Sequence, residues 1–311
     1  MNVKVSIVVP FYNESENVRP LYEALFSALA RMECTYEMVF VDDGSSDGTV
    51  ASLRKLQVED PSIRVVCFRK NFGQTAAMRA GIQAARGSII VTMDGDLQND
   101  PSDIPKLIAK IEEGNDLVIG WRKDRKDPAW TRTLPSRMAN WLISRITGVI
   151  VHDSGCSLKA YRGSMIKKVP LYSEMHRFIP AMSTLQSTRI AEVVVKHHAR
   201  KFGESKYGLS RVGKVLLDVV AIKMLISFRH RPLQYFSAMA IPFLLFAMFS
   251  GVVYSIARLS GSSAFVVSSI AFLLFSYLTV HFFFVGLLAE LVIRAGKREA
   301  LPKATVEHVN A

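Results

Sequence analysis

The sequence is poor in cysteine and lacks the two commonest phosphate-binding loops. Its three cysteines, Cys34, Cys67 and Cys156, show no paired or metal-type spacing, which argues against a disulfide framework and a zinc site and fits a reduced, cytosolic environment. Neither a GxGxxG pattern nor a GxxxxGK pattern followed by Ser or Thr occurs. A dinucleotide-binding Rossmann site and a P-loop are therefore unsupported.

The start of the chain also lacks the long apolar stretch of a secretory signal. Met1 leads into a short apolar run, residues 5–9, that ends at Pro10. We therefore expect the folded domain to stay in the cytoplasm. The chain has 39 basic and 27 acidic side chains, a formal net charge of +12. This excess predicts an acidic partner, which could be nucleic acid, anionic lipid or a phosphorylated substrate.

Two long stretches near the C-terminus, residues 233–257 and 264–288, contain no charged residue. At ~1.5 Å per residue, each exceeds the ~30 Å thickness of the hydrocarbon core of a bilayer. We predict two transmembrane helices forming a hairpin over residues 232–293, followed by a cytosolic tail over residues 294–311. Basic residues flank the hairpin, while its connecting loop carries only Arg258. The positive-inside rule therefore places both ends in the cytosol, as expected for an integral protein of the cytoplasmic (inner) membrane.

The first 120 residues alternate short apolar runs with segments of helical spacing. The runs predict strands at residues 5–9, 38–41, 64–68, 89–93 and 117–119. The segments between them predict helices at residues 17–32, 49–59, 75–85 and 101–113. This alternation is typical of an α/β domain with a Rossmann-like, mainly parallel sheet that is covered on both faces.

Acidic residues follow three of these predicted strands. Glu14 comes soon after the first strand, Asp42 and Asp43 directly after the second, and Asp94 and Asp96 directly after the fourth. In open parallel sheets, ligands bind beyond the carboxyl ends of the strands. Two carboxylates separated by one flexible glycine offer hard oxygen ligands to Mg²⁺ or Mn²⁺, the ions that accompany phosphates. The pattern indicates a metal-nucleotide site, although Asp-Gly also marks ordinary turns.

Two basic segments separate this region from the hairpin. Residues 121–137 are rich in lysine and arginine and predict a mobile loop, followed by a helix over residues 138–147. In the second basic segment, residues 212–228 alternate apolar and polar positions at helical spacing. We predict that residues 211–231 form an amphipathic helix at the membrane interface.

The motifs and their order resemble glycosyltransferase family 2, and within it the polyprenyl-phosphate glycosyltransferases. The resemblance rests on Pro-Phe-Tyr-Asn-Glu at residues 10–14, Asp-Asp-Gly-Ser at 42–45, Asp-Gly-Asp-Leu-Gln at 94–98 and the C-terminal hairpin. It implies a GT-A domain over residues 1–210 that transfers a sugar, with inversion, from a nucleotide diphosphate to a polyprenyl phosphate lipid of the undecaprenyl type. Relatives also suggest a homo-oligomer, namely a tetramer. The run at residues 153–162 looks closest to the aminoarabinose transferases, which favours a UDP-linked donor.

The resemblance also implies roles for residues on the donor side. The implied nucleotide-binding residues are Pro10, Tyr12, Glu14, Asp42, Asp43, Arg69 and Asp94. The metal and diphosphate positions match Asp94, Asp96 and Gln98, with Mg²⁺ or Mn²⁺ as the ion and Asp96 counted as catalytic. Lys206 lies in a Gly-x-Ser-Lys-Tyr element that closes over phosphates in the family, where a cation would stabilise the leaving diphosphate. The alternative for Lys206 is an ordinary solvated lysine.

On the acceptor side, the resemblance points to Asp153 and Arg177. Asp153 matches the catalytic base of related transferases, but a lipid monophosphate has a second pKa near ~6 and needs no strong base. Asp153 therefore either removes a residual proton, orients a hydroxyl of the donor sugar, or only forms a turn. Arg177 is expected to pair with the lipid phosphate, together with Lys201 and Lys206, unless it is simply an exposed arginine at a helix start.

Two other functions are open from the sequence. A processive polysaccharide synthase shares the early motifs, but its Gln-x-x-Arg-Trp element precedes none of the three tryptophans. A catalytically inactive membrane scaffold, or a basic nucleic-acid binder, is the other alternative. Basic residues near the apolar stretches, without an RNA-binding aromatic signature, favour a membrane and a nucleotide sugar as partners and no nucleic acid. His281, inside the second apolar stretch, is expected to pack against a neighbouring helix.

Overall fold

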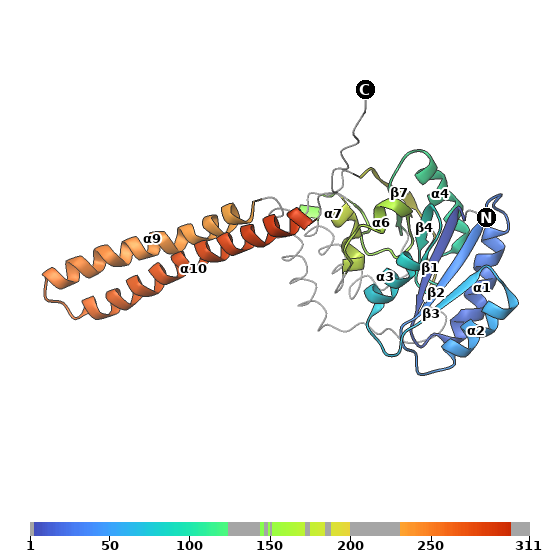
Figure 1. Cartoon of the computed structure of the whole chain (residues 1–311), viewed down its shortest axis with the longest axis horizontal. Coiled ribbons are helices and arrows are strands. Elements are labelled where there is room, and N and C mark those ends of the chain that lie inside the picture. Colours follow the sequence, from blue (N-terminus) through green and yellow to red (C-terminus); the bar gives the residue numbers. More distant parts are fainter. Residues whose placement is uncertain are drawn as a thin grey trace, which may run out of the picture. The chain divides into compact units, whose positions relative to one another are not determined.

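The computed structural model describes residues 3–123, 144, 145, 149, 151–171, 175–183, 188–199 and 231–299. The chain divides into two compact units, Met1–Ile222 and Lys223–Ala311. The first unit contains a sheet with its helices, and the second contains two long helices (Figure 1). The predicted amphipathic helix at residues 211–231 and the predicted helix at residues 138–147 lie almost entirely outside the described residues.

A seven-stranded sheet forms the centre of the first unit, in the order β3-β2-β1-β4-β6-β5-β7. The strands are β1 Val5–Phe11, β2 Tyr36–Asp42, β3 Ile63–Cys67, β4 Ile89–Thr92, β5 Leu117–Trp121, β6 Lys159–Arg162 and β7 Ile190–Val194. Strands β1 to β4 run parallel to one another, and β7 is parallel to β5. β6 is antiparallel to both of its neighbours. The predicted mainly parallel sheet is confirmed, but β6 and β7 have no counterpart among the predicted strands.

Helices cover both faces of this sheet (Figure 1). They are α1 Ser15–Leu29, α2 Thr49–Glu59, α3 Gln74–Ala84, α4 Ile104–Glu112, α6 Gly163–Ile166 and α7 Ile179–Ser183, with the 3-10 turns η1 Pro101–Asp103 and η3 Met175–Phe178. Apolar residues of α1, α2 and α4 share one core cluster with Val5, Ile7 and Val9 of β1. α3 packs against Val8, which points to the other face because side chains alternate along a strand. All residues of β1 and β4 are buried, as expected for central strands covered on both sides.

The order of the strands reverses at β1, which lies between β2 and β4. Open α/β sheets bind ligands at the carboxyl ends of the strands beside such a reversal. Phe11 pairs with Asp42 and Val8 with Thr92, so the residues that follow β1, β2 and β4 leave the sheet at the same edge. The three acidic motifs predicted from the sequence therefore lie along one edge of the sheet.

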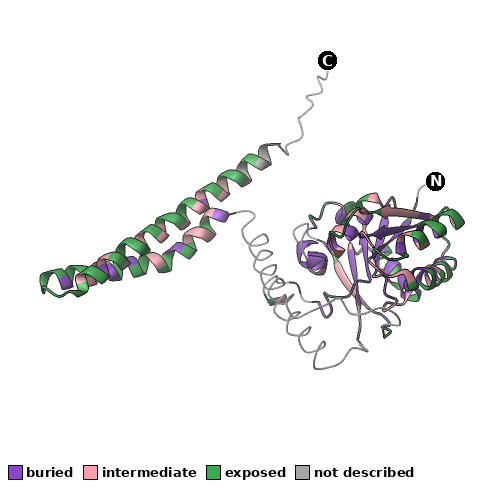
Figure 2. Cartoon of the chain, turned by 90° about the horizontal axis from the view of Figure 1, so that it is seen from below, coloured by how far each residue is buried: buried purple, intermediate pink, exposed green. Residues whose placement is uncertain are grey.

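The second unit is a helical hairpin. α9 spans Pro232–Leu259 and α10 spans Ala264–Glu299, and both are long and apolar enough to cross a membrane. The positions buried inside the hairpin are mostly small, among them Ala240, Ala247, Ser250 and Ser268. Most other positions are exposed (Figure 2), and many of these are large and apolar. A continuous exposed apolar surface is costly in water and supports insertion into a bilayer.

The packing predicted for His281 is wrong within this hairpin. The side chain is exposed and stacks on Tyr277 of its own helix, with the ring centroids 5.7 Å apart. The aromatic contacts between α9 and α10 are made instead by Phe243 with Phe282 and by Phe246 with Phe275, each at a centroid distance of 5.3 Å.

Candidate active site

Asp42 is the last residue of β2, and only one of the two oxygens of its buried carboxylate accepts hydrogen bonds. Its Oδ2 accepts the N–H groups of Gly44 and Ser45, each at 3.0 Å. Its Oδ1 is buried and has no hydrogen-bond partner among the described residues. Because an unsatisfied buried acceptor costs free energy, a donor on a ligand would stabilise this site. This arrangement fits the predicted nucleotide-binding role of Asp42, since the nucleobase of a nucleotide can donate such an N–H.

Asp43 instead anchors the loop that follows β3. Its Oδ1 accepts the N–H of Phe72 at 2.8 Å and its Oδ2 accepts the N–H of Gly73 at 2.9 Å. Burial raises the pKa of Asp43, although these two bonds act in the opposite direction. Gly44 has a φ of +71°, and a Cβ there would lie 2.3 Å from the carbonyl carbon of Lys70. The turn after β2 and the loop after β3 therefore form one connected structure, on which the predicted nucleotide residue Arg69 is exposed.

The residues after β1 border the same edge. Pro10 is buried, Tyr12 is half-buried, and Glu14 accepts the side-chain amide of Asn17 at 2.5 Å. A Cβ on Gly95 would lie 3.1 Å from the carbonyl oxygen of Pro10 and 2.8 Å from the ring of Phe11. The glycine between the two acids was expected to give flexibility. It is required instead because the chain passes too close to β1 for any side chain.

Asp94 and Asp96 follow β4 and lie beside the strand reversal. Asp94 Oδ1 accepts the side-chain amide of Gln74 at 2.6 Å, and its own N–H donates to Ser157 Oγ at 3.3 Å. Asp96 Oδ1 accepts the N–H of Gln98 at 3.2 Å, across Leu97, whose φ is +59°. Burial, and after it the charge of Asp96, raise the pKa of Asp94 to about 6. The two acids thus repel each other in a site that a cation would stabilise.

This acid pair fits a divalent ion that is shared with a substrate. In the part of the chain that the structure describes, no group of three or more His, Cys, Asp or Glu residues could hold a metal. Mg²⁺ bound with phosphates usually takes only one or two carboxylates, and its other ligands are phosphate oxygens and water. Asp94 and Asp96 supply such a pair. The main chain of Gln98 is already engaged, because its carbonyl accepts the N–H of His198 at 2.8 Å.

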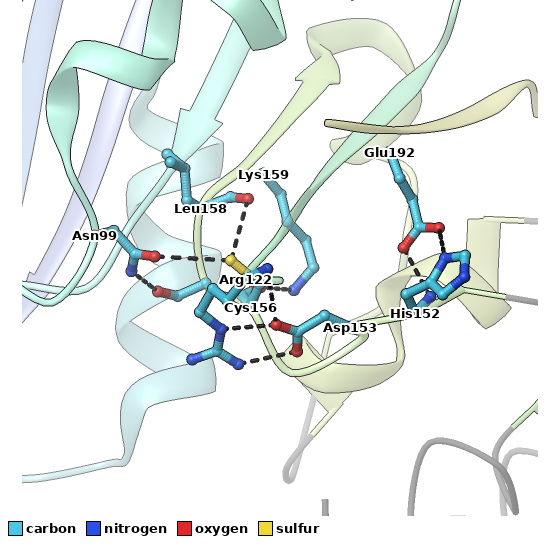
Figure 3. Close-up of polar contacts among 9 residues, drawn as sticks. Asn99, Arg122, His152, Asp153, Cys156, Leu158, Lys159 and Glu192 are labelled. Atoms are coloured by element: carbon cyan, nitrogen blue, oxygen red, sulfur yellow. Dashed lines mark hydrogen bonds and ion pairs between the residues drawn. The ribbon is translucent and has the colours of Figure 1, made fainter. Parts of the chain in front are cut away.

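Arg122 and Asp153 form a bidentate ion pair that is largely buried (Figure 3). Arg122 Nε donates to Oδ2 at 2.7 Å and Nη2 donates to Oδ1 at 2.9 Å. The side chains are only 12% and 5% exposed. Arg122 was predicted to belong to a mobile basic loop, and this is wrong for residues 121 and 122, because Trp121 ends β5 and Arg122 is fixed by Asp153. Each oxygen of Asp153, the predicted catalytic base, therefore accepts a hydrogen bond from Arg122.

Next to Asp153, His152 forms a second link between the same elements. Its ring stacks on Trp121 at a centroid distance of 4.3 Å. Glu192 of β7 accepts its backbone N–H at 2.8 Å, and the other Glu192 carboxylate oxygen lies 2.7 Å from Nδ1 (Figure 3). These contacts fix the segment that carries Asp153 against β5 and β7.

Lys159 is a buried cation that the sequence did not single out. It lies on β6, is 3% exposed, and its Nζ donates to the carbonyl oxygen of Cys156 (Figure 3). Burial lowers the pKa of Lys159 to about 8, while the charges of Asp153 and Asp94 act in the opposite direction. Burial also raises the pKa of the Cys156 thiol to about 11, which makes it unreactive. The only signal in the sequence was the few apolar residues around Lys159, namely Leu158, Ala160 and Tyr161.

Of the three residues predicted to bind the acceptor phosphate, the structure describes only Arg177. Arg177 lies half-buried in η3, and its neighbour His176 has Nδ1 2.7 Å from Thr75 Oγ1 at the start of α3. The acceptor segment is therefore tied to the same helix that contacts Asp94. Lys201 and Lys206 lie outside the described residues, and their contacts with phosphate stay predictions.

Residues 6–172 match the glycosyl transferase family 2 domain. The chain belongs to glycosyl transferase family 2. It is 48% identical over 244 residues to the dodecaprenyl-phosphate galacturonate synthase of Rhizobium johnstonii, covering 77% of this chain and 72% of the relative. It is 41% identical over 218 residues to the undecaprenyl-phosphate 4-deoxy-4-formamido-L-arabinose transferase of Edwardsiella ictaluri, covering 70% and 66%. The family predicted from the motifs is confirmed.

Solved structures confirm the GT-A fold of this family 2 chain. Glucosyl-3-phosphoglycerate synthase from Mycobacterium tuberculosis, in complex with Mn²⁺, UDP and phosphoglyceric acid, aligns with a TM-score of 0.52 at 20% identity, over 71% of this chain and 78% of that one. TarS of S. aureus, in complex with UDP-GlcNAc, aligns with a TM-score of 0.51 at 21% identity, over 72% and 67%. At this identity the likeness establishes the fold alone.

Proposed function

We propose that this protein transfers a sugar, with inversion, from a UDP-linked donor to a polyprenyl phosphate of the undecaprenyl type. The observation that carries the proposal is the pair Asp94 and Asp96 at the strand reversal, near Arg122 and the buried Lys159, in a chain that also has a long apolar hairpin. The two curated relatives, which act on polyprenyl phosphates by name, support the acceptor.

Different residues of this chain would bind the nucleotide-sugar donor and the lipid phosphate acceptor. Asp42 Oδ1 would accept an N–H of the base, and the Asp43 turn would shape the wall of the nucleotide site. Asp94 and Asp96 would hold Mg²⁺ or Mn²⁺, which when bound neutralises charge on the diphosphate. Asp153 is presented by Arg122 and can accept a hydrogen bond from a hydroxyl of the donor sugar. Arg177 would pair with the lipid phosphate.

In the proposed reaction a phosphate oxygen of the lipid attacks the anomeric carbon on the face opposite the diphosphate. The new bond joins this oxygen to the anomeric carbon, and the bond from that carbon to the diphosphate oxygen breaks. A phosphate monoester is mostly dianionic at neutral pH, so attack needs no strong general base. Asp153 therefore acts by orienting the sugar, which is consistent with both of its oxygens being engaged by Arg122.

We further propose that the hairpin anchors the protein in the cytoplasmic membrane, with the catalytic unit in the cytosol. The lipid phosphate then lies at the interface where the catalytic unit works, and the product can leave into the bilayer. Cysteine-substituted versions of the loop at residues 260–263 and of the catalytic unit, labelled from each side of the membrane, test this topology.

The decisive experiment is transfer of radiolabel from UDP- and GDP-sugars, UDP-galacturonic acid included, to undecaprenyl phosphate in detergent, with and without EDTA. We expect one UDP-sugar to label the lipid and chelation to abolish the signal. Label in a growing polysaccharide would favour a processive synthase instead. Absence of transfer from every donor, with salt-sensitive binding to nucleic acid, would overturn the proposal.

A further inference from the structure

Gln74 is the first residue of α3 and it contacts the acid pair directly. Its side-chain amide donates to Asp94 Oδ1 at 2.6 Å, across 20 residues of sequence. One oxygen of Asp94 therefore accepts a hydrogen bond from an uncharged group. This hydrogen bond fixes the direction of the carboxylate while leaving its negative charge for a cation.

The backbone that carries Gln74 is itself fixed from β2. Asp43 accepts the N–H groups of Phe72 and Gly73, the two residues that immediately precede Gln74. The turn at Gly44 lies against the same loop, because a side chain on Gly44 would collide with the backbone of Lys70. Gln74 is therefore held by a short chain of contacts from Asp43 through the loop to Asp94.

This chain of contacts also explains why a glutamine is suited to the position. A lysine would neutralise Asp94 and compete with a metal ion, and a glutamate would add a third acid to the pair. Groups that hydrogen-bond to metal-ligating carboxylates set ligand orientation, and removing one typically lowers metal affinity by about 10- to 100-fold. An amide supplies that hydrogen bond without changing the charge of the site.

We propose that Gln74 is a positioning residue for the divalent ion, and that Asp43 holds Gln74 in place. Gln74 orients Asp94 so that its second oxygen faces the ion and the donor diphosphate. Asp43 thus supports the metal site rather than contacting the nucleotide itself. This inference rests on the proposed function, because it requires the acid pair to bind a divalent ion.

The test is direct measurement of Mn²⁺ affinity in the full-length protein in detergent, with UDP present and no acceptor. Free Mn²⁺ is followed by electron paramagnetic resonance. We expect Gln74→Leu to raise the Kd for Mn²⁺ by about tenfold. Asp43→Asn replaces one accepting oxygen with an NH₂ group and should also raise the Kd. The double variant should be no weaker than the worse single variant, since both changes break the same chain of contacts.

A matched control lies on the same helix. Gln83 also donates its amide, to the carbonyl oxygen of Lys167 at 3.1 Å, but away from the acids. Gln83→Leu should leave the Kd for Mn²⁺ unchanged. In transfer assays, Gln74→Leu should lower kcat at limiting Mn²⁺ and leave the KM for polyprenyl phosphate unchanged.

Each outcome separates this inference from the proposed function. Tight Mn²⁺ binding by the unaltered protein with no change in Gln74→Leu would overturn the positioning role and leave the proposed function standing. If the unaltered protein binds no Mn²⁺, the metal site fails and the inference falls with it. A lower thermal midpoint in Gln74→Leu with an unchanged Kd would assign the contact to stability alone.

Discussion

Replacing Arg122 with methionine should destabilise the catalytic unit far more than replacing an exposed arginine. Arg122 and Asp153 are 12% and 5% exposed, and two hydrogen bonds of 2.7 and 2.9 Å join them. Removing one partner of such a pair leaves a buried charge without compensation, at a cost of about 3–5 kcal/mol. The nearby charge of Lys159 offsets part of this cost, so we expect about 3 kcal/mol.

For a domain of this size, 1 kcal/mol lowers the melting temperature by about 2–4 °C, so Arg122→Met should lower it by about 6–12 °C. The assay is thermal unfolding of the full-length protein in detergent, followed by tryptophan fluorescence. Arg162→Met is the matched control. Arg162 pairs with Asp116 at 3.1 Å, but the side chains are 43% and 29% exposed. Exposed pairs contribute about 1 kcal/mol or less, so this control should shift by less than about 4 °C.

A double variant tests the cause of the loss. Arg122→Met is expected to destabilise the protein because it leaves the buried carboxylate of Asp153 without a cation. The double variant Arg122→Met with Asp153→Leu removes that carboxylate as well, so it should recover most of the lost stability. Apolar replacements of whole buried ion pairs are often neutral. Equal shifts for Arg122→Met and Arg162→Met, or a double variant as unstable as the single one, would refute the reasoning.

Three further predictions concern the same cluster. Asp96→Asn should abolish sugar transfer and leave the melting temperature within a few degrees of the unaltered protein; retained transfer would remove Asp96 from the metal site. Because the pKa of Asp94 is raised from 3.8 to about 6, the folded state binds this proton more readily than the unfolded chain, and stability falls as pH rises through this interval. Asp94→Asn should therefore be more stable by up to about 3 kcal/mol above pH 6 in EDTA and gain nothing below about pH 4, which denaturant titrations at several pH values can check. The pKa of Lys159 is lowered from 10.5 to about 8, so the unfolded state binds more protons between these values and stability rises with pH there. Lys159→Met should flatten that rise, and an unchanged slope would contradict it.

The central strands were predictable because burial on both faces leaves a continuous apolar run in the sequence. β1 and β4 are fully buried and appear as such runs. β6 has only four residues, and both its first and last carry a positive charge, so it lacks the usual signal of a strand. β7 is a half-buried strand at the edge of the sheet, where Glu192 interrupts a short apolar run. Its pairing with β5 depends on tertiary contacts that composition does not reveal.

The acids of the site were predictable and their partners were not. Asp42 ends a buried strand and Asp94 and Asp96 follow one, and the geometry of a parallel sheet brings such residues to one edge. Arg122 and Asp153 are 31 residues apart, so nothing local in the sequence pairs them. For this reason the basic composition of residues 121–137 suggested a solvated loop. The contact between Gln74 and Asp94 is hidden in the same way, because it depends on how α3 packs on β1 and β2.

The charges of this cluster explain why the proposed reaction needs a divalent ion. Asp94, Asp96 and Asp153 are three carboxylates, and even Asp94, whose pKa burial raises to about 6, is mostly ionised at neutral pH. Arg122 and Lys159 supply two positive charges, since the pKa of Lys159 is about 8. The cluster is therefore negative by about one charge, and it would repel a diphosphate that is itself negative. One divalent cation reverses the sign of the site. The same argument explains why Gln74 is a neutral donor: a cation at that position would make the cluster neutral and weaken its hold on the ion.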